Sequence, residues 1–287
     1  MRAFSEFLSD KKVLDALRKA RSIMVIGEVD TGKTTLVGEM ARCLSVSNDI
    51  AVCDLDVGQS SIGPPTTIGW GKVKEDFTLL QEILPEDIFF TGTLSPEGNL
   101  LPCLTGAKII TQRASSRCKK IIIDTTGYLS APPARVLKEY KIDLIAPDVV
   151  IGIEKRDEIC ALLAPFSSNE APRVFRIQQP PQVKQKTMEM RAQFREKRFL
   201  DYFSGAVSHL ISLKKYRTRF TRQPVSIDAF DLIGRIVSFR DGRNRDIALG
   251  IIREVDRKKD TLLVDTPLTG RIDFTTLMVG VAKLSLP

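Results

Sequence analysis

The stretch SIMVIGEVDTGKTT, residues 22–35, decides the fold of this chain. An apolar run leads into Gly27, from which the pattern G-x-x-x-x-G-K-T continues to Thr34. The glycines let the backbone turn tightly, so that successive N–H groups face inward at the positive end of the next helix. The stretch therefore predicts a phosphate-binding loop between a strand and a helix. The expected nucleotide contacts are Gly27, Glu28, Val29, Asp30, Thr31, Gly32, Lys33, Thr34 and Thr35.

Two side chains of this loop have distinct expected roles. Lys33 should reach the β- and γ-phosphates of a nucleoside triphosphate, and the Thr34 hydroxyl should bind Mg²⁺. The loop alone does not identify the group that would receive a phosphate.

Short β-branched runs alternate with helical stretches from residue 22 to about residue 177. Several runs are almost wholly apolar, which is typical of a parallel sheet covered by helices on both faces. The predicted class is α/β: a P-loop NTPase domain with a mainly parallel sheet and helices on both faces, a helical lid and a small C-terminal β module. Strands are predicted at 22–26, 50–54, 88–90, 120–124, 149–153 and 174–177, and helices at 34–44, 100–117, 135–140 and 157–163.

Changes of composition divide the chain into four parts. Residues 1–21 predict a short amphipathic helix, and residues 22–177 the P-loop core. A Pro-Pro pair marks a hinge into residues 178–223, a basic lid with linker helices. Residues 224–287 contain strand-like runs punctuated by glycine, which predict a small antiparallel β module.

The net charge of +8 is concentrated in one block. Residues 171–223 hold thirteen Lys and Arg against three acidic residues, a local net charge of +10, so the rest of the chain carries −2. Such a block indicates either a polyanionic partner or a solvated face that keeps the protein soluble.

Several classes of protein are excluded by patterns that the sequence lacks. No apolar run approaches the roughly 18 residues of a membrane-spanning helix, and the N-terminus has no signal-peptide pattern. We therefore expect a cytoplasmic protein without membrane contact. The five cysteines include no C-x-x-C pair, which indicates reduced thiols rather than a zinc site. His209 is the only histidine and no G-x-S-x-G surrounds a serine, so a Ser-His-Asp triad is not expected.

Three carboxylates follow predicted strands. Asp54 and Asp56 lie in DLDVGQ, and alternation along an extended chain sends both to one side. At the ligand-facing edge of the sheet, one could hold the metal or its waters and the other could accept a proton; alternatively, both are turn caps. Asp124 ends the run IIID, as a Walker B carboxylate near Mg²⁺ does.

Two further groups suit a phosphodiester substrate. Residues 125–128, TTGY, offer hydroxyls, a flexible backbone and the ring of Tyr128, which could stack on a base or simply pack against nearby prolines. Arg191, Arg195 and Arg198 form one stripe of a helix. The stripe suits either a clamp on a transferring phosphoryl group or a solvated basic face.

Three motifs, taken in order, resemble those of one known family. They are D-x-G-K-T-T at 30–35, DLDVGQSSIGPPTTIG at 54–69, and R-x-x-x-R followed by Y-F-x-G within 191–205. The chain thus resembles the polynucleotide 5′-hydroxyl kinases related to the RNA-kinase subunit of the eukaryotic pre-mRNA cleavage factor and to the nucleolar ribosomal-RNA-processing kinase. The resemblance covers roughly residues 20–205 and continues more loosely to the end. It implies an ATP-dependent, Mg²⁺-requiring kinase for the 5′-hydroxyl end of RNA, with DNA left open and no protein partner indicated.

The resemblance also implies residue roles. Asp56 matches the acidic residue that activates the 5′-hydroxyl, residues 125–128 match a T-x-G-W clasp on the first nucleotides, and the lid arginines stabilise the transition state. The expected catalytic residues are Lys33, Asp56, Arg191 and Arg195. The residues expected near the metal are Thr34, Asp54 and Asp124. Those expected at the substrate are Gln59, Thr125, Thr126, Gly127, Tyr128 and Arg198.

The sequence departs from the family pattern in two places. Tyr128 stands where the family often has Trp, which bears on acceptor preference. Only about 20 residues precede the first predicted strand, where eukaryotic members carry a longer N-terminal domain. This favours a compact prokaryotic or archaeal version.

Two other functions stay open at this point. One is a non-catalytic ATP-binding scaffold of an RNA-processing complex. The other is a regulatory P-loop GTPase, for which Lys155–Asp157 offers a K-x-D near-match to the guanine-recognition signature.

Overall fold

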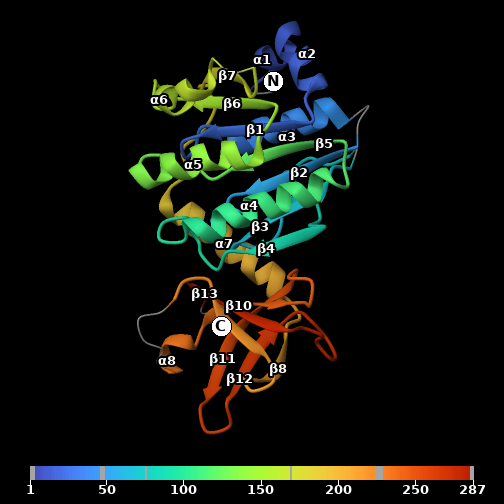
Figure 1. Ribbon diagram of the computed structural model, residues 1–287, viewed down its shortest axis with the longest axis vertical. Coiled ribbons are helices and arrows are strands. Elements are labelled where there is room, and N and C mark those ends of the chain that lie inside the picture. The colour runs from blue at the N-terminus through green and yellow to red at the C-terminus, as the bar shows by residue number, and fades with distance from the viewer. Residues whose placement is uncertain (1–3, 46–48, 75, 169, 224–228, 285–287) are drawn as a thin grey trace.

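The computed structural model describes residues 4–45, 49–74, 76–168, 170–223 and 229–284, which form an α/β domain above a smaller β domain in Figure 1. The α/β domain is built on a seven-stranded sheet with the order β4-β3-β2-β5-β1-β6-β7. The strands β2, β5, β1, β6 and β7 are parallel, whereas β3 pairs antiparallel with both β2 and β4. The predicted mainly parallel sheet is confirmed. The strands are β1 (Ser22–Gly27), β2 (Ile50–Leu55), β3 (Thr67–Lys72), β4 (Asp87–Phe90), β5 (Lys120–Thr125), β6 (Val149–Glu154) and β7 (Arg173–Gln178).

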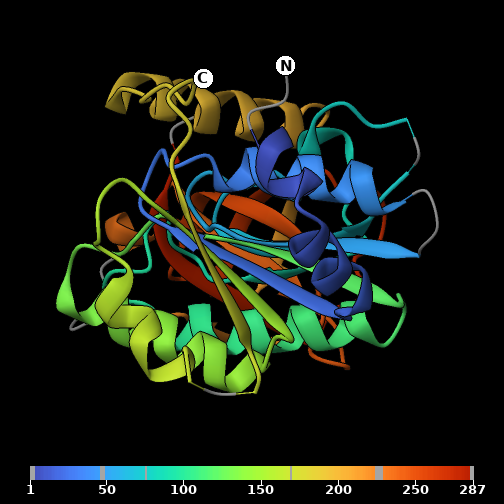
Figure 2. The ribbon, with the colours of Figure 1, turned by 90° about the horizontal axis from the view of Figure 1, so that it is seen from above.

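Helices cover both faces of this sheet. One apolar cluster joins the sheet to α1 (Ser5–Ser9), α2 (Lys11–Lys19) and α3 (Lys33–Ser45). The other joins it to α4 (Leu100–Ser115), α5 (Pro132–Ile145) and α6 (Cys160–Leu163). Two short 3-10 turns, η1 (Leu80–Glu82) and η2 (Ala164–Phe166), lie in the connections. Figure 2 shows the two helical layers on opposite sides of the strands.

The structure differs from the predicted elements in local details. The expected single N-terminal helix is wrong: Asp10 separates α1 from α2, because its side chain accepts hydrogen bonds from the N–H groups of Lys12 and Val13 and caps the second helix. Helix α5 begins earlier than predicted, at a Pro-Pro pair that suits a first helical turn. Strand β3 was not predicted, since its sequence TIGWGK contains two glycines.

The C-terminal domain is a six-stranded sheet with the order β8-β12-β11-β10-β13-β9. Most of its pairs are antiparallel, as predicted, but β9 runs parallel to β13. Strands β8 and β9 come from the range 178–223, which was expected to hold a basic lid with linker helices, and no strand was predicted there. Helix α7 (Met188–Phe203) leads into this domain, and α8 (Ala229–Leu232) precedes β10. The strands are β8 (Val207–Ser212), β9 (Arg217–Phe220), β10 (Arg235–Arg240), β11 (Asp246–Asp256), β12 (Thr261–Thr266) and β13 (Thr276–Lys283).

A buried ion pair lies where the two domains meet. Arg240 Nε and Nη2 donate to Asp246 Oδ1 and Oδ2 at 3.0 and 2.8 Å, and the two side chains are only 7% and 1% exposed. Asp246 Oδ2 also accepts the N–H of Phe90 in β4 at 2.8 Å. The Arg240 guanidinium lies 5.2 Å from the ring centroid of Phe89. One carboxylate therefore connects the C-terminal sheet to the edge strand of the P-loop sheet.

Backbone contacts and an apolar cluster complete this junction. The Gly92 carbonyl, just after β4, accepts the N–H groups of Val281 and Ala282 in β13 at 2.8 and 3.0 Å. Phe90 packs in one cluster with Phe199 and Phe203 of α7 and with side chains of the C-terminal sheet. The junction thus fixes the C-terminal domain to the end of α7 and to β4.

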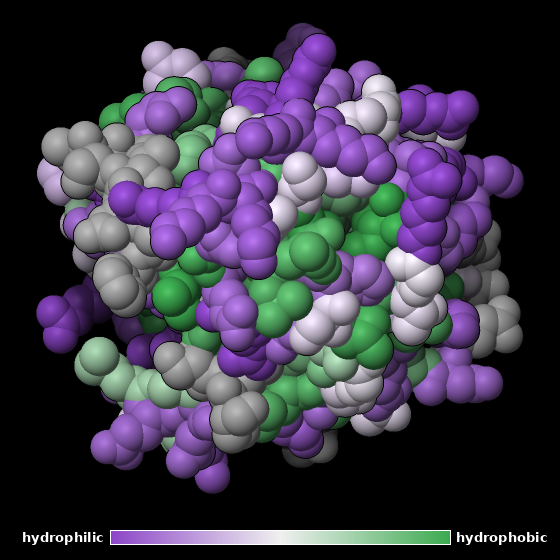
Figure 3. Space-filling view, turned by 90° about the horizontal axis from the view of Figure 1, so that it is seen from below, coloured by the Kyte–Doolittle hydropathy of each residue, from purple (hydrophilic) through white to green (hydrophobic). Residues whose placement is uncertain are grey.

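The C-terminal domain forms the face of the molecule seen from below. On this face, hydrophobic side chains gather near the middle with hydrophilic ones around them (Figure 3). Within the described ranges, no helix has the length and apolar character needed to cross a membrane.

The junction generates a stability prediction. Asp246→Ala should lower the free energy of unfolding by about 3–5 kcal/mol, because it leaves Arg240 buried without its partner and Phe90 N–H without its acceptor. Denaturant titration followed by circular dichroism measures the change. Asp157→Ala is the matched control, since that carboxylate is 86% exposed in its pair with Arg176 and should contribute less than about 1 kcal/mol. Equal effects of the two substitutions would contradict the structural role of Asp246.

Candidate active site

A crevice of about 530 Å³ lies at the carboxyl ends of the central strands, beside the phosphate loop. It is covered by residues 179–203, the segment from the end of β7 through α7, which we call the lid. In Figure 2, α7 lies along the side of the molecule that carries α1 and α3. The predicted site residues that line the crevice are Val29, Asp30, Gly32, Lys33, Thr34, Thr35, Asp56, Gln59, Thr126, Gly127, Arg191 and Arg195.

The phosphate loop joins β1 to α3 in a tight turn. A Cβ atom on Gly27 would lie 2.5 Å from the carbonyl oxygen of Ile153, so the close approach of β6 requires glycine here. Lys33 begins α3, and its Nζ donates to the carbonyl oxygen of Glu28 at 2.5 Å. Lys155 Nζ donates to the Val29 carbonyl oxygen at 3.0 Å and supports the loop from outside. The predicted strand–loop–helix arrangement is present.

Charged groups are buried together beneath this loop. Burial lowers the pKa of Lys33, while Asp124, Asp56 and Asp30 act in the opposite direction. Asp124 Oδ2 accepts the Thr34 hydroxyl at 2.6 Å. Burial raises the pKa of Asp124 to about 6, against the opposing effects of Lys33 and of the Thr34 hydrogen bond. A hydroxyl and a carboxylate, the oxygen ligands that Mg²⁺ prefers, therefore meet next to the phosphate-binding lysine.

The two carboxylates of DLDVGQ have different environments. Asp54 is buried: its Oδ1 accepts the N–H of Asp56, and its Oδ2 accepts the N–H of Ser61 at 2.5 Å and of Ile62 at 3.2 Å. Burial, reinforced by the charges of Asp124 and Asp56, raises the pKa of Asp54 well above its usual range. Asp54 thus holds the loop that follows β2, and it does not line the crevice. Its expected metal contact stays a prediction.

Asp56 lines the crevice with one oxygen fixed. Its Oδ1 accepts the N–H groups of Gly58 and Gln59, both at 3.0 Å. Its Oδ2 accepts no hydrogen bond from the part of the chain that the structure describes. The carboxylate is therefore oriented by the backbone while one oxygen stays available to a ligand.

The lid docks on the phosphate loop through Asp30. Asp30 Oδ2 pairs with Arg191 Nη2 at 2.5 Å and accepts the N–H of Lys186 at 3.0 Å. Gln59 Nε2 donates to the carbonyl oxygen of Arg191 at 3.2 Å, so the loop after β2 also holds the lid. Arg195 lines the same crevice. Two of the three arginines in the predicted stripe therefore line the crevice.

The third arginine, Arg198, has a different position from the one expected. Its Nη2 donates to the carbonyl oxygens of Ser61 and Gly63 at 3.1 and 2.6 Å, and it does not line the crevice. Burial lowers the pKa of Arg198. This guanidinium fastens the middle of α7 to the loop that Asp54 organises.

Residues 125–128 divide between the protein interior and its surface cavities. The Thr125 hydroxyl is buried, donating to the Val25 carbonyl oxygen at 2.8 Å and accepting from Lys138 Nζ at 2.9 Å. Lys138 Nζ also donates to the Thr126 carbonyl oxygen. Thr126 and Gly127 line the crevice, whereas Tyr128 lines a neighbouring cavity. The segment is thus held from behind by a buried lysine.

Several residues of the site were not predicted from the sequence. Lys184 and Lys186 line the crevice, and only their membership in the basic block gave a signal. Lys138 was not predicted, since a lysine in a helix carries no sign that its ammonium group will be buried. Among the described residues, no group of three or more His, Cys, Asp or Glu could hold a metal ion alone.

Comparisons with known proteins agree with this geometry. The family model described as mRNA cleavage and polyadenylation factor CLP1 P-loop matches residues 27–205, from the phosphate loop to the end of the lid. The chain belongs to the CLP1 P-loop family. The resemblance predicted from the three motifs is confirmed, and P-loop nucleotide binding follows from membership of this family.

Five of the six relatives of this chain that the comparison gives are archaeal, and the sixth is a CLP1 homolog of Brugia malayi. The polyribonucleotide 5′-hydroxyl-kinase of Methanocaldococcus jannaschii is 36% identical over 190 residues, 66% of this chain and 52% of the relative. The protein of the same name from Pyrococcus horikoshii is 27% identical over 270 residues, 92% of this chain and 73% of the relative. The chain spans about half the length of most archaeal relatives that it matches.

Solved structures of Clp1p with Pcf11p share the fold. Two such structures give TM-scores of 0.75 and 0.72 at 14% and 15% identity. The matches cover 98% and 95% of this chain, and 79% and 77% of the solved chains. At this level of identity the similarity concerns the fold alone, and its coverage of this chain extends beyond the P-loop domain into the C-terminal domain.

The docked lid generates a prediction about local opening. Asp30→Asn should speed amide hydrogen exchange in residues 183–191 about five-fold, because the lid loses a half-buried ion pair of about 1 kcal/mol. Asn tolerates the left-handed backbone of position 30, where φ is 57°, so the loop itself should keep its shape. Exchange measured by mass spectrometry checks this, with Asp157→Ala as control. Unchanged exchange in the lid would contradict the role of Asp30 as its anchor.

Proposed function

We propose that this chain is an ATP-dependent kinase that transfers the γ-phosphate to the 5′-hydroxyl end of RNA, with DNA as a second acceptor to be tested. The observation that carries the proposal is one crevice that brings together Lys33, the available oxygen of Asp56 and the arginines of the lid. The names of the archaeal relatives, polyribonucleotide 5′-hydroxyl-kinase, support the same activity.

The phosphate loop and its neighbours would bind the nucleotide. The backbone N–H groups of the loop and Lys33 would contact the β- and γ-phosphates. The Thr34 hydroxyl and the Asp124 carboxylate fit Mg²⁺, with phosphate oxygens and water as its other ligands. Bound there, the ion would neutralise phosphate charge. ATP is the nucleotide proposed for this site.

Asp56 would act on the acceptor. Its Oδ2 would accept the proton of the 5′-hydroxyl while the hydroxyl oxygen forms a bond to the γ-phosphorus, and the bond from that phosphorus to the β–γ bridging oxygen breaks. Two backbone N–H groups fix the other carboxylate oxygen, so the base needs little reorientation. Arg191 and Arg195 would stabilise the negative charge on the transferring group, as mobile arginines do in phosphoryl transfer.

Closing the lid would also exclude water. The lid reaches the phosphate loop and the loop after β2 at the same time, through Asp30 and Gln59. A covered crevice favours transfer to the bound alcohol over hydrolysis of the nucleotide. The five cysteines are free thiols in the structure, in keeping with the cytoplasmic location that we propose.

The GTPase alternative is less well supported. Lys155 supports the phosphate loop, and Asp157, the carboxylate of the K-x-D near-match, is exposed and paired with Arg176 at 2.9 Å, but the archaeal relatives bear the name of a kinase. A direct comparison of ATP and GTP affinities decides between the two nucleotides.

A substitution at Asp56 tests the kinase and the scaffold alternative together. Asp56→Asn keeps Oδ1 as the acceptor for the two loop N–H groups but replaces the proton-accepting oxygen by an amide nitrogen. Transfer of label from γ-labelled ATP to a 5′-hydroxyl oligoribonucleotide should fall by about 10²-fold or more. Binding of MgATP should change little.

The control is Asp143→Asn, an exposed carboxylate on α5, which should transfer phosphate at the wild-type rate. Wild-type protein that binds ATP but transfers no label would contradict the kinase and favour a nucleotide-binding scaffold. Undiminished transfer by Asp56→Asn would remove the proposed base from the mechanism.

A further inference from the structure

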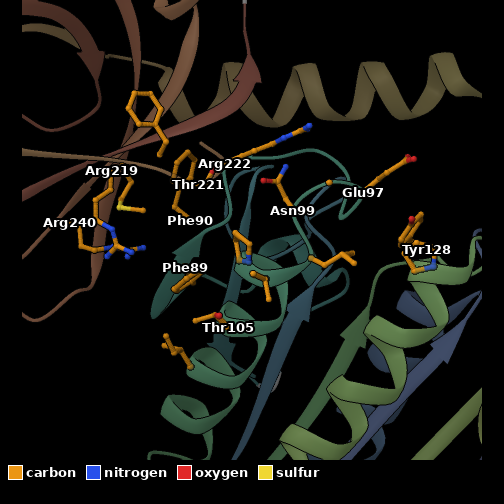
Figure 4. A pocket seen from close by; sticks show the side chains of 18 of the residues that line it. Phe89, Phe90, Glu97, Asn99, Thr105, Tyr128, Arg219, Thr221, Arg222 and Arg240 are labelled. Atoms are coloured by element: carbon orange, nitrogen blue, oxygen red, sulfur yellow. The ribbon is translucent and has the colours of Figure 1, made fainter. Parts of the chain in front are cut away.

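A second and larger cavity, of about 910 Å³, lies between the two domains. Figure 4 shows its walls: the start of α4 and the ring of Tyr128 on the P-loop side, and side chains of β9 and β10 on the other. The proposed function uses none of the residues on the C-terminal wall. The cavity is large enough for parts of an extended ligand.

The cavity continues from the crevice along two short segments. Leu94 lines the crevice, and Glu97 and Asn99, a few residues later, line the cavity. Likewise, Thr126 and Gly127 line the crevice and the next residue, Tyr128, lines the cavity. A polymer whose end lies at Asp56 would enter the interdomain cavity as it leaves the crevice along these walls.

Two arginines on the C-terminal wall have no protein partner. Arg219 and Arg222 are exposed, and neither guanidinium group forms an ion pair or a hydrogen bond with any residue in the described ranges. Arg222 reaches across to the P-loop domain: a Cβ atom on Gly98 would lie 3.0 Å from its Nη1 (Figure 4). In contrast, Arg240 is fully engaged with Asp246. Unpaired guanidiniums in a cavity suit phosphate groups.

A buried acceptor on the opposite wall also lacks a partner. Asn99 is 4% exposed, and its Oδ1 accepts no hydrogen bond within the described chain. Leaving such an atom unsatisfied costs about 1–3 kcal/mol, so a ligand that supplies a donor is favoured. Base amino groups and the 2′-hydroxyl of RNA are donors of this kind. Tyr128 adds an aromatic ring on which a base could stack.

We propose that this interdomain cavity is a second acceptor subsite, which binds the nucleotides that follow the 5′-terminal one in a single-stranded RNA. Arg219 and Arg222 contact its phosphodiester groups, and Asn99 accepts a hydrogen bond from a base or a ribose. The inference rests on the proposed function, because it assumes a 5′ end in the crevice. It assigns the C-terminal domain a direct part in acceptor binding.

The test compares acceptors of different length. The ratio of kcat/KM for a 5′-hydroxyl hexanucleotide to that for a nucleoside 3′-phosphate should be well above one in the wild type. In the double variant Arg219→Ala/Arg222→Ala, this ratio should fall about ten-fold. The matched control is Lys258→Ala/Arg271→Ala, which removes the same charge from exposed positions of the C-terminal domain outside the cavity. The control should keep the wild-type ratio.

A binding measurement separates this inference from the proposed function. Fluorescence anisotropy with a labelled 5′-phosphorylated hexanucleotide needs no catalysis. The plot of log K against log salt should become less steep, its negative slope shrinking in magnitude by about 1.4 in the arginine double variant, since each lost single-strand phosphate contact contributes about 0.7. If the wild type transfers no phosphate, the kinase proposal fails. The difference in salt dependence between the wild type and the arginine double variant still shows whether the cavity binds RNA.

Three results would overturn the inference. One is transfer with no dependence on acceptor length; another is an arginine variant that matches the control in both measurements. The third is an acidic peptide that binds the wild type but not the arginine double variant, while the labelled hexanucleotide binds neither, which would make the cavity a protein-docking site.

Discussion

The site depends on keeping charged side chains out of water at the carboxyl ends of three adjacent strands. Lys33, Asp54 and Asp124 are all buried there, and an isolated buried charge would be strongly unfavourable. Each has a fixed partner: a loop carbonyl for Lys33, backbone N–H groups for Asp54 and a hydroxyl for Asp124. The partners hold these groups in place before any ligand binds, which is the condition for electrostatic catalysis.

The same arrangement explains how distant segments share one crevice. Asp54 shapes the loop after β2, Asp56 and Gln59 project from that loop, and Gln59 holds the lid. Asp30 holds the lid from the phosphate loop, and Arg198 fastens it to the far side of the Asp54 loop. The position of the lid arginines therefore depends on polar contacts with two loops and not on hydrophobic packing of α7 alone.

Local patterns were enough to predict the phosphate loop, six strands of the first sheet and a helix that carries Arg191, Arg195 and Arg198. Each of these features has a local sequence pattern: a glycine-rich turn, an apolar run, or polar and apolar residues at helical spacing. Strands β8 (VSHLIS) and β9 (RTRF) were not predicted. Their charged and polar side chains are typical of a solvated lid as well as of an exposed strand. Whether such a segment forms a strand depends on the neighbouring strands with which it pairs.

The hydrogen-bond partners of side chains were harder to predict than the helices and strands. Thr125 and Arg198 were expected to contact the substrate, but the first bonds to β1 and Lys138, and the second to loop carbonyls. Their directions follow from tertiary contacts between segments 13 to 137 residues apart, which no local motif encodes. Lys138 is a residue that was not predicted and yet supports the site. Only the folded structure shows that its ammonium group bonds to the turn at residues 125–127.

The place of β13 in the second sheet has a consequence for biosynthesis. The first sheet has all its strands once residue 178 has been made, so the P-loop domain could fold while the ribosome is still translating the rest. β13 lies between β10 and β9 and also bonds to Gly92, so the second sheet stays open until residues 276–283 are available. Until then the Gly92 carbonyl after β4 lacks its partners Val281 and Ala282, and the apolar cluster at the end of α7 lacks Met278 and Ala282, so nascent chains at this stage expose part of that cluster.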